Sequence, residues 1–513
     1  MTGADAVLAT LADNGVEACF ANPGTSEMPF VSALDREPRV RPVLCLFEGV
    51  ATGAADGYAR MALKPAATLL HLGPGYANGI ANLHNARRAF SPVVNIIGEH
   101  ALRHRQYEAP LTSDIQALAK PGARWLAMAA SPDEAAALAA EAVVQSLGPP
   151  GGLANLILPA DCAWSPASGR GPVPPKPVRR LVESARITAA ARALAAARRP
   201  VLLLGGQACL AQGVAAAGRI ASGGVRVITD TFSPRLARGA GLWAFERLPY
   251  FAEQALGALE GCDLMLIVGT QAPVAFFAYP DLPSLLVPDG CEAQVLADPG
   301  EDAIQALTDL AEAMGRPAKA APPAAPAPSP ASGPLNAYGV GAALARHLPA
   351  GAVVSDDAVT SSLPVISQTR GAAPHDWLAL TGGAIGQGLP AAVGAAVACP
   401  GRKVVALTGD GAAMYTLQAL WTLARERLDV TVVVFANHAY RILNVELART
   451  GAGAPGPAAA SLLSLGDPPL DWVSLAQGMG VPAERCATAE TFDAACAAAM
   501  AQPGPRLIEA VLG

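Results

Sequence analysis

The stretch LTGDGAAMYTLQALWTLARERLDVTVVVFANHAY, residues 407–440, contains two strongly apolar runs separated by a helix-forming segment. The runs KVVALT and VTVVVFA predict buried parallel strands, and residues 414–427 predict the helix that connects them. Because a strand–helix–strand unit is right-handed and both strands run the same way, Asp410 and Asn437 should emerge at one carboxyl edge of the sheet. Open α/β sheets bind their ligands at that edge.

The residues around Asp410 favour a phosphate and a metal ion as that ligand. Gly409 and Gly411 flank the aspartate and permit a tight turn with close approach of the backbone to a phosphate. A carboxylate and an amide oxygen are hard-oxygen ligands suited to Mg²⁺, so the stretch predicts a Mg²⁺–diphosphate site. The alternative is an Asp-Gly turn whose carboxylate only caps a helix, and Asn437 at the next strand end disfavours it.

Outward from this stretch, the chain divides into three parts. Its 513 residues suggest about three domains at ~150 residues each, and two Pro-rich segments, 165–180 and 315–334, have the composition of linkers. Residues 1–165, 181–315 and 335–513 each alternate short apolar runs with amphipathic helical stretches. This pattern predicts an α/β protein with three consecutive doubly wound, mostly parallel-sheet domains.

Composition excludes several classes of protein. The net charge is −6 with no basic cluster, so a nucleic-acid partner is not expected. No apolar stretch reaches the ~20 residues that cross a bilayer, and the N-terminus lacks the basic region of a secretory signal. The nine cysteines contain no C-x-x-C pair, which favours a reducing compartment. We therefore expect a cytoplasmic protein with no membrane partner.

Residues 69–86 and 378–396 share a succession of strand, Gly-rich turn and helix. This echo is too common in α/β folds to prove a relationship. It permits the interpretation that the first and third domains are related.

The G-D-G sequence followed by Asn437 resembles the metal and diphosphate motif of thiamine diphosphate enzymes. The resemblance covers the whole chain: CFANPGTSEMPFV and FEGVATGAADGYAR resemble the family's pyrimidine-binding domain, and GGAIGQGLPAAVGAA its diphosphate-binding domain. Within the family the chain is most similar to the acetolactate synthase-like and benzoylformate decarboxylase-like branch. The resemblance implies thiamine diphosphate and Mg²⁺ as cofactors. It also implies a homodimer or tetramer with the active site between subunits.

The resemblance assigns roles to individual residues. Asp410, Asn437 and the backbone carbonyl of Ala439 match the metal ligands, and Glu48 matches the glutamate that hydrogen-bonds N1′ of the aminopyrimidine. From FEG alone, Glu48 would be interpreted as a helix-N-terminal glutamate interacting with the helix dipole. The cofactor-binding positions that the resemblance implies are Pro23, Gly24, Asn78, Thr360, Gly383, Ile385, Gly409, Gly411, Ala412 and Tyr440.

Two further residues match catalytic positions of the benzoylformate decarboxylase-like members. His71 follows the strand AATLL and is expected to point into the cleft, and Thr25 matches a hydroxyl that contacts the substrate carboxylate. Those relatives use a second histidine from the middle domain. This chain has none in APVAFFAYPD, residues 272–281, where Phe276 and Phe277 are expected to face the cleft.

The expected reaction is decarboxylation of a small 2-oxo acid followed by carboligation to a carbonyl acceptor, as in acetolactate synthase. Simple 2-oxo acid decarboxylation and non-catalytic diphosphate binding are the alternatives. FAD binding is not supported, because LMLIVGTQAPVAFF lacks the arginine that the synthases carry there and VLLLGGQACLAQG is not a G-x-G-x-x-G.

Overall fold

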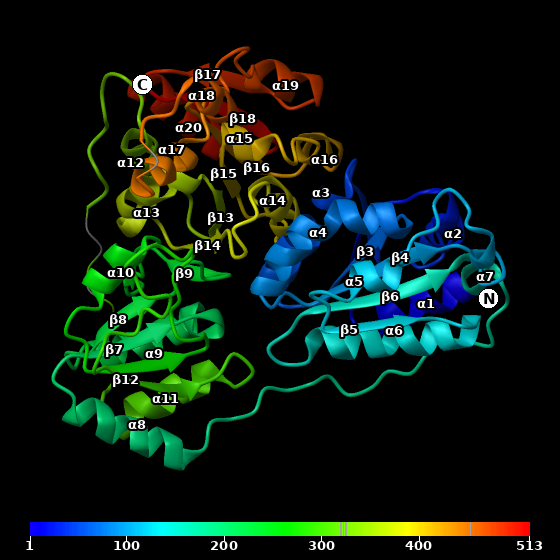
Figure 1. The fold of residues 1–513 in the computed structure, drawn as a ribbon, viewed down its shortest axis with the longest axis horizontal. Helices are drawn as coiled ribbons and strands as arrows, with labels where there is room; N and C mark the ends of the chain where they lie inside the picture. The colour runs from blue at the N-terminus through cyan, green and yellow to red at the C-terminus, as the bar shows by residue number, and fades with distance from the viewer. Residues whose placement is uncertain (319–320, 322, 324–325, 452) are drawn as a thin grey trace.

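The computed structural model describes residues 1–318, 321, 323, 326–451 and 453–513. These residues form three α/β units, each built around a mostly parallel sheet, which confirms the predicted fold class (Figure 1). Part of the predicted linker at 315–334 lies outside the described residues. The other linker, 165–180, contains no helix or strand and is anchored to the first unit through hydrogen bonds with Thr10 and Asn14.

The first unit contains six parallel strands in the order β2-β1-β3-β4-β6-β5. Its apolar strands are buried because helices cover both faces of the sheet. Its elements are α1 (Gly3–Asp13), β1 (Ala18–Asn22), α2 (Met28–Leu34), β2 (Arg41–Leu44), α3 (Glu48–Ala62), β3 (Ala66–Leu70), α4 (Leu72–Arg88), β4 (Val93–Glu99), α5 (Ile115–Ala119), β5 (Trp125–Met128), α6 (Pro132–Leu147), β6 (Leu153–Pro159) and α7 (Ala160–Trp164).

The central unit contains five parallel strands in the order β10-β8-β7-β11-β12. One short strand of its sequence, β9 (Leu236–Arg238), leaves this sheet and pairs antiparallel with β14 of the third. Its other elements are α8 (Ser184–Ala196), β7 (Pro200–Leu204), α9 (Ala211–Ala221), β8 (Arg226–Thr229), β10 (Glu246–Arg247), α10 (Ala252–Ala258), β11 (Leu264–Val268), β12 (Glu292–Ala297) and α11 (Ala303–Ala313).

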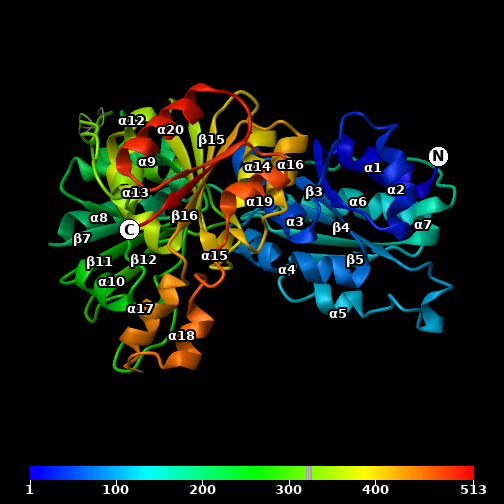
Figure 2. The ribbon, with the colours of Figure 1, turned by 90° about the horizontal axis from the view of Figure 1, so that it is seen from above.

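The third unit has the strand order β17-β18-β16-β15-β13-β14, extended at one edge by β9. Figure 2 shows α17 and α18 standing away from the rest of this unit. Its elements are α12 (Ala337–His347), β13 (Ala352–Asp357), α13 (Ser362–Gln368), β14 (His375–Ala379), α14 (Gly388–Ala398), β15 (Val404–Gly409), α15 (Asp410–Ala413), α16 (Ala419–Arg425), β16 (Val430–Ala436), α17 (Arg441–Arg449), α18 (Pro457–Leu463), α19 (Trp472–Gly478), β17 (Ala483–Cys486), α20 (Ala489–Ala501) and β18 (Arg506–Val511).

The first and third sheets have the same topology. If each unit's six strands are numbered along its own sequence, both sheets have the order 2-1-3-4-6-5. This supports the interpretation that the two units are related. The two segments with similar sequence, 69–86 and 378–396, do not occupy equivalent places. The first begins at the end of the third strand of its sheet, and the second begins at the end of the second strand of its sheet. The topological counterpart of β14–α14 is β2–α3.

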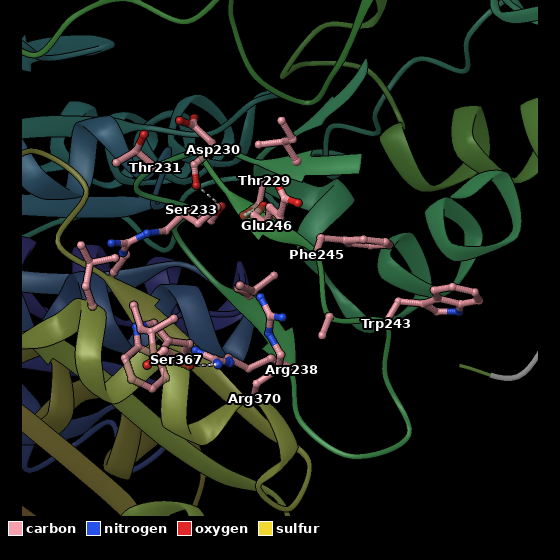
Figure 3. Close-up of a pocket in the computed structure, with 18 of the residues that line it drawn as sticks. Thr229, Asp230, Thr231, Ser233, Arg238, Trp243, Phe245, Glu246, Ser367 and Arg370 are labelled. Carbon is pink, nitrogen blue, oxygen red and sulfur yellow. Dashed lines mark hydrogen bonds between the residues drawn. The ribbon is translucent and has the colours of Figure 1, made fainter. Parts of the chain in front are cut away.

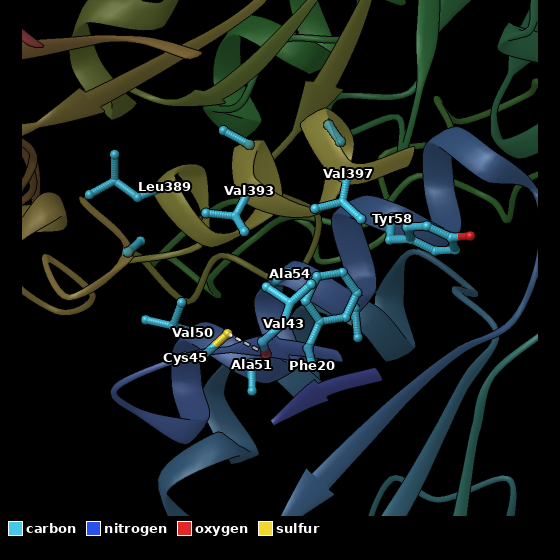
Figure 4. Close-up of a cluster of buried hydrophobic side chains, with 14 of the residues drawn as sticks. Phe20, Val43, Cys45, Val50, Ala51, Ala54, Tyr58, Leu389, Val393 and Val397 are labelled. Carbon is cyan, nitrogen blue, oxygen red and sulfur yellow. Dashed lines mark hydrogen bonds between the residues drawn. The ribbon is translucent and has the colours of Figure 1, made fainter. Parts of the chain in front are cut away.

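These two counterpart helices, α3 and α14, pack directly against each other and join the first unit to the third. Figure 4 shows Val50, Ala54 and Tyr58 of α3 facing Val393 and Val397 of α14 in one apolar cluster. Small residues allow the close approach, since a Cβ added to Gly394 would overlap the backbone of α3.

A buried ion pair adds polar contacts to this junction. Arg60 Nη2 lies 2.5 Å from Asp56 Oδ2, and Arg60 also donates to the carbonyl of Ala379 at 2.8 Å and to Thr381 Oγ1 at 2.9 Å. Removing either partner of such a pair would leave a buried, uncompensated charge. The bonds from Arg60 to Ala379 and Thr381 tie the first unit to the third.

The predicted helix at 414–427 is shorter than expected. The helix α16 begins only at Ala419, after the single turn α15 and a run of tight turns. The reason is tertiary, because the Thr416 hydroxyl donates to the carbonyl of Gly386 at 2.8 Å and holds these turns against the neighbouring loop. Among the helices that the structure describes, none combines the length and apolarity needed to span a bilayer.

Candidate active site

Asp410 and Asn437 emerge at the same carboxyl edge of the third sheet, as the sequence predicts. Their strands, β15 and β16, pair in parallel up to Gly409 and Phe435. The backbone N–H of His438 donates to Asp410 Oδ2 at 2.7 Å, and that of Gly411 donates to Oδ1 at 2.8 Å. The loop after one strand is therefore fixed to the carboxylate that follows the other.

Asp410 is a buried carboxylate. Its exposure is 2%, and no lysine or arginine of the described residues pairs with it. Burial raises its pKa above the usual range, while the backbone N–H groups oppose that shift. Asn437 lies in the loop after β16, where its Oδ1 accepts a hydrogen bond from Ala439 N at 3.0 Å. These oxygens fit a divalent cation that prefers hard ligands.

The predicted phosphate-binding residues surround this carboxylate. A Cβ added to Gly409 would meet nothing within 4 Å, so the backbone there is open to a ligand. Gly411 lies against the ring of Tyr440, where a side chain would clash, and Ala412 is buried beside it. The structure thus gathers four predicted residues around Asp410.

The loop between β14 and α14 carries two other predicted residues, Gly383 and Ile385. It is fixed by Asp357 at the end of β13, whose Oδ2 accepts hydrogen bonds from Gly386 N at 2.8 Å and Gly388 N at 3.2 Å. Burial raises the pKa of Asp357 to about 7. Gly383 has a φ of +76°, and the ring of Phe276 from the central unit packs on it where a side chain would clash. Sequence reasoning missed Asp357.

In the first unit, Glu48 opens the helix α3 and is only 6% exposed. Its Oε2 accepts a hydrogen bond from Asn78 Nδ2 of α4 at 3.0 Å, so the two predicted residues lie together. Pro23 and Gly24 follow β1 at the same carboxyl edge, and Thr25 next to them is exposed.

His71 has a partner that the sequence analysis missed. Its Nδ1 lies 2.7 Å from Glu27 Oε2 and 3.3 Å from the Ser26 hydroxyl, and the same Oε2 accepts Gly24 N–H at 2.8 Å. Glu27 resembles a helix-capping residue in sequence, since it follows a Gly-Thr-Ser turn. One residue in the sequence does indicate a close contact here. Gly98 interrupts the apolar run of β4, and a side chain at that position would overlap the Glu27 carboxylate.

Backbone strain occurs beside the predicted residues in both units. Leu72, Val359 and His438 have φ values of 50°, 50° and 55°, in the left-handed region that non-glycine residues avoid. Leu72 follows His71, Val359 precedes Thr360, and His438 lies between Asn437 and Ala439. Such strain persists only where surrounding contacts enforce it, and it concentrates at ligand sites.

The first unit meets the third at the loop of Gly383 and Ile385, where Asn85 Nδ2 of α4 donates to the carbonyl of Ala384 at 2.8 Å. Among the described residues, no hydrogen bond or ion pair joins Glu48, Asn78 or His71 to Asp410 or Asn437. The exposed rings of Phe276 (41%) and Phe277 (53%) stand at the third unit's side of the site.

Comparison with known families identifies both units. Residues 1–120 match the model described as "Thiamine pyrophosphate enzyme, N-terminal TPP binding domain", and residues 360–510 match "Thiamine pyrophosphate enzyme, C-terminal TPP binding domain". The matched ranges contain every predicted site residue.

Individual proteins match along their whole length. The chain is 49% identical to the Mycobacterium tuberculosis protein named "Putative acetolactate synthase large subunit IlvX", covering 100% of this chain and 99% of that protein. It is 30% identical to a benzoylformate decarboxylase of Pseudomonas aeruginosa, covering 97% and 96% of the two chains. The solved structure of the Rhodococcus jostii RHA1 thiamine diphosphate-dependent 4-hydroxybenzoylformate decarboxylase superposes with a TM-score of 0.88 at 26% identity, covering 100% of this chain and 99% of that one.

Proposed function

The chain belongs to the thiamine pyrophosphate enzyme family, and from that premise we propose that it is an acetolactate synthase-like carboligase. Its reaction removes CO₂ from a small 2-oxo acid and joins the remaining carbons to a second carbonyl compound. The product is a 2-hydroxy ketone. The metal, the site residues and the subunit arrangement below are parts of this proposal.

Thiamine diphosphate, when bound, supplies an acidic carbon that adds to the substrate carbonyl and a positively charged ring that accepts the electrons left by CO₂. Glu48 hydrogen-bonds the N1′ atom of the aminopyrimidine and exchanges a proton there. Asn78 orients the Glu48 carboxylate through the bond at 3.0 Å. This relay serves both the start of the reaction and product release.

Asp410, Asn437 and the Ala439 carbonyl hold Mg²⁺ against the diphosphate. The support is the buried Asp410 carboxylate, which no cationic side chain of the described residues neutralises. Gly409 and Gly411 let the backbone approach the phosphate oxygens, and Ile385 props the cofactor from the adjacent loop.

Each active centre, in this proposal, combines residues of two subunits. Glu48, Asn78 and His71 of one subunit then face Asp410 and Asn437 of another. We therefore propose a homodimer as the minimal active unit. Its support is the family's arrangement, in which the active site lies between subunits, and the exposure of Phe276 and Phe277.

The observation that carries the carboligase proposal is the scarcity of proton donors near the reacting carbon. His71 is the single imidazole assigned to the cleft, and its Nδ1 faces Glu27 at 2.7 Å. The central unit contributes Phe276, not a histidine, beside Gly383. Loss of one positioned acid typically slows a proton transfer by ~10²–10⁴, which leaves time for an acceptor carbonyl to react.

The test measures CO₂ release from pyruvate by the enzyme loaded with thiamine diphosphate and Mg²⁺. We expect slow release from pyruvate alone and faster release when an aldehyde or a second 2-oxo acid is added. The His71→Ala variant should turn over more slowly while retaining the cofactor. His104→Ala, which changes an imidazole of the first unit outside the site, is the matched control.

Simple decarboxylation is the second candidate. Its support is the aromatic cluster of Phe232, Tyr250 and Phe276, whose ring centroids lie 5.1–6.2 Å apart, because it offers an apolar surface to an aromatic substrate. Fast aldehyde release from benzoylformate, indifferent to added acceptor, would favour this candidate over carboligation.

A further inference from the structure

A cavity of about 320 Å³ lies between the central and third units, and none of the predicted site residues lines it. It is walled by β8, β9 and the following loop on one side and by α13 and β14 on the other (Figure 3). Aromatic side chains flank it, and three arginines line it: Arg238, Arg247 and Arg370.

The three arginines have no acidic partner among the described residues. Arg238 is only 9% exposed; its guanidinium donates to the carbonyl of Ile366 at 2.6 Å and stacks 4.9 Å from the Trp377 ring centroid. Arg247 and Arg370 make no hydrogen bond or ion pair with any described side chain. Figure 3 shows Arg238 and Arg370 on the same side of the cavity.

Gathering these charges is unfavourable without an anion. Burial and, to a smaller extent, the nearby charges of Arg247 and Arg370 together lower the pKa of Arg238 to about 9. A guanidinium stays charged in proteins, so a buried one normally pairs with a carboxylate or phosphate. The helix-end carbonyl of Ile366 is a partial dipole and does not neutralise three charges.

The acidic groups near the cavity are fewer in effect than the three arginines. Glu246 pairs with Arg226 outside the cavity, and Asp230 accepts the Thr270 hydroxyl at 2.8 Å at the opposite end. Asp356 lies behind Trp377, whose ring N–H donates to it at 3.2 Å, and its charge offsets part of the charge of Arg238 and Arg247. The positive charge facing the cavity is therefore in excess.

We propose that this cavity binds a small phosphate monoester with a flat apolar part. Three guanidinium groups offer more charge than a single carboxylate can neutralise, whereas a phosphate monoester is a dianion with three acceptor oxygens. Trp243 and Phe245 supply apolar surface for the rest of the molecule. The volume lies within the range of small-molecule sites. Because the cavity joins two units, its occupant also holds the central unit against the third.

The test uses the enzyme loaded with thiamine diphosphate and Mg²⁺, so that the diphosphate site is filled. The probe is 1-naphthyl phosphate, followed by tryptophan fluorescence because Trp243 and Trp377 line the cavity. We expect saturable quenching, at least tenfold weaker binding of 1-naphthoate, and no saturable binding of 1-naphthol.

Variants locate the binding. Arg370→Gln, at an exposed position, and Arg247→Gln should each weaken 1-naphthyl phosphate binding at least tenfold. Arg192→Gln is the matched control because it removes an exposed arginine of α8 in the same unit that does not line the cavity, and it should bind as the wild type does. Equal binding of naphthol and naphthyl phosphate, or unchanged affinity in both cavity variants, would overturn the proposal.

Discussion

The first and third sheets share one strand order but carry different chemistry at their carboxyl edges. The first presents side chains bonded to one another, Glu48 with Asn78 and His71 with Glu27. The third presents Asp410, whose hydrogen bonds within the described part of the chain come from backbone N–H groups. We therefore propose proton transfer at the first edge and cation binding at the third. The difference teaches that the scaffold sets where a ligand binds and the loops set what is done to it.

The sharpest test of the first edge is Glu48→Gln. The variant should bind thiamine diphosphate but slow exchange of the cofactor's C2 proton by ~10²–10⁴, because an amide cannot relay a proton to N1′. NMR of acid-quenched samples in D₂O measures this rate. Glu17→Gln, on the surface of the same unit, is the control. An unchanged exchange rate would remove Glu48 from the proposed relay.

The corresponding test of the third edge is Asp410→Ala. It removes the only carboxylate assigned to Mg²⁺, so thiamine diphosphate affinity should fall by about 100-fold or more. Calorimetric titration with Mg²⁺ present measures the loss, and Asp471→Ala, an exposed helix cap of the same unit, should leave it unchanged. Wild-type affinity in Asp410→Ala would contradict the metal assignment.

A substitution at the junction tests whether the counterpart helices hold the two units together. Gly394→Ala places a methyl group against the backbone of α3, and such overpacking costs about 1–3 kcal/mol of the free energy of unfolding. The melting temperature should fall accordingly. Gly257→Ala is the matched control, because that helical glycine faces open space and should gain up to about 1 kcal/mol. Equal melting temperatures for the two variants would show that α3 and α14 tolerate separation.

The smallest effect is expected from Asp357→Asn, which gives β13 the residue type that ends β1, Asn22. The pKa of Asp357 is raised to about 7 from 3.8, so its contribution to stability is complete below pH 3.8 and is lost as pH rises through about 7. In cofactor-free protein, asparagine should flatten the change in melting temperature between pH 5 and 8 by a few degrees. A slope identical to that of the wild type would contradict the assignment.

Much of the fold follows from local sequence patterns. The apolar runs ending at Asp410 and Asn437 gave the strands and their shared edge correctly, because burial on both faces of a parallel sheet leaves a continuous apolar run. The break before Ala419 escaped prediction, because it depends on the Thr416–Gly386 contact and not on helix propensity.

The site shows the same division. Asp410 was predicted from its position at the end of an apolar run, and Glu48 from its match to the family's motif; both roles stay predictions. Glu27 was missed, because its partner His71 is 44 residues away and its local sequence fits an ordinary helix cap; Gly98 in β4 indicates a close contact but not with which residue.

By itself, the sequence determined the α/β class, the family, and the edges that carry the carboxylates. These depend on short-range order: alternation of apolar runs with helices and a few residues at strand ends. Only the tertiary structure decided that Glu27 supports His71, that Asp357 holds the loop of Ile385, and that Arg238 gathers with two other arginines at a domain boundary. These are contacts between segments that are far apart in the sequence, and no local pattern of residues predicts them.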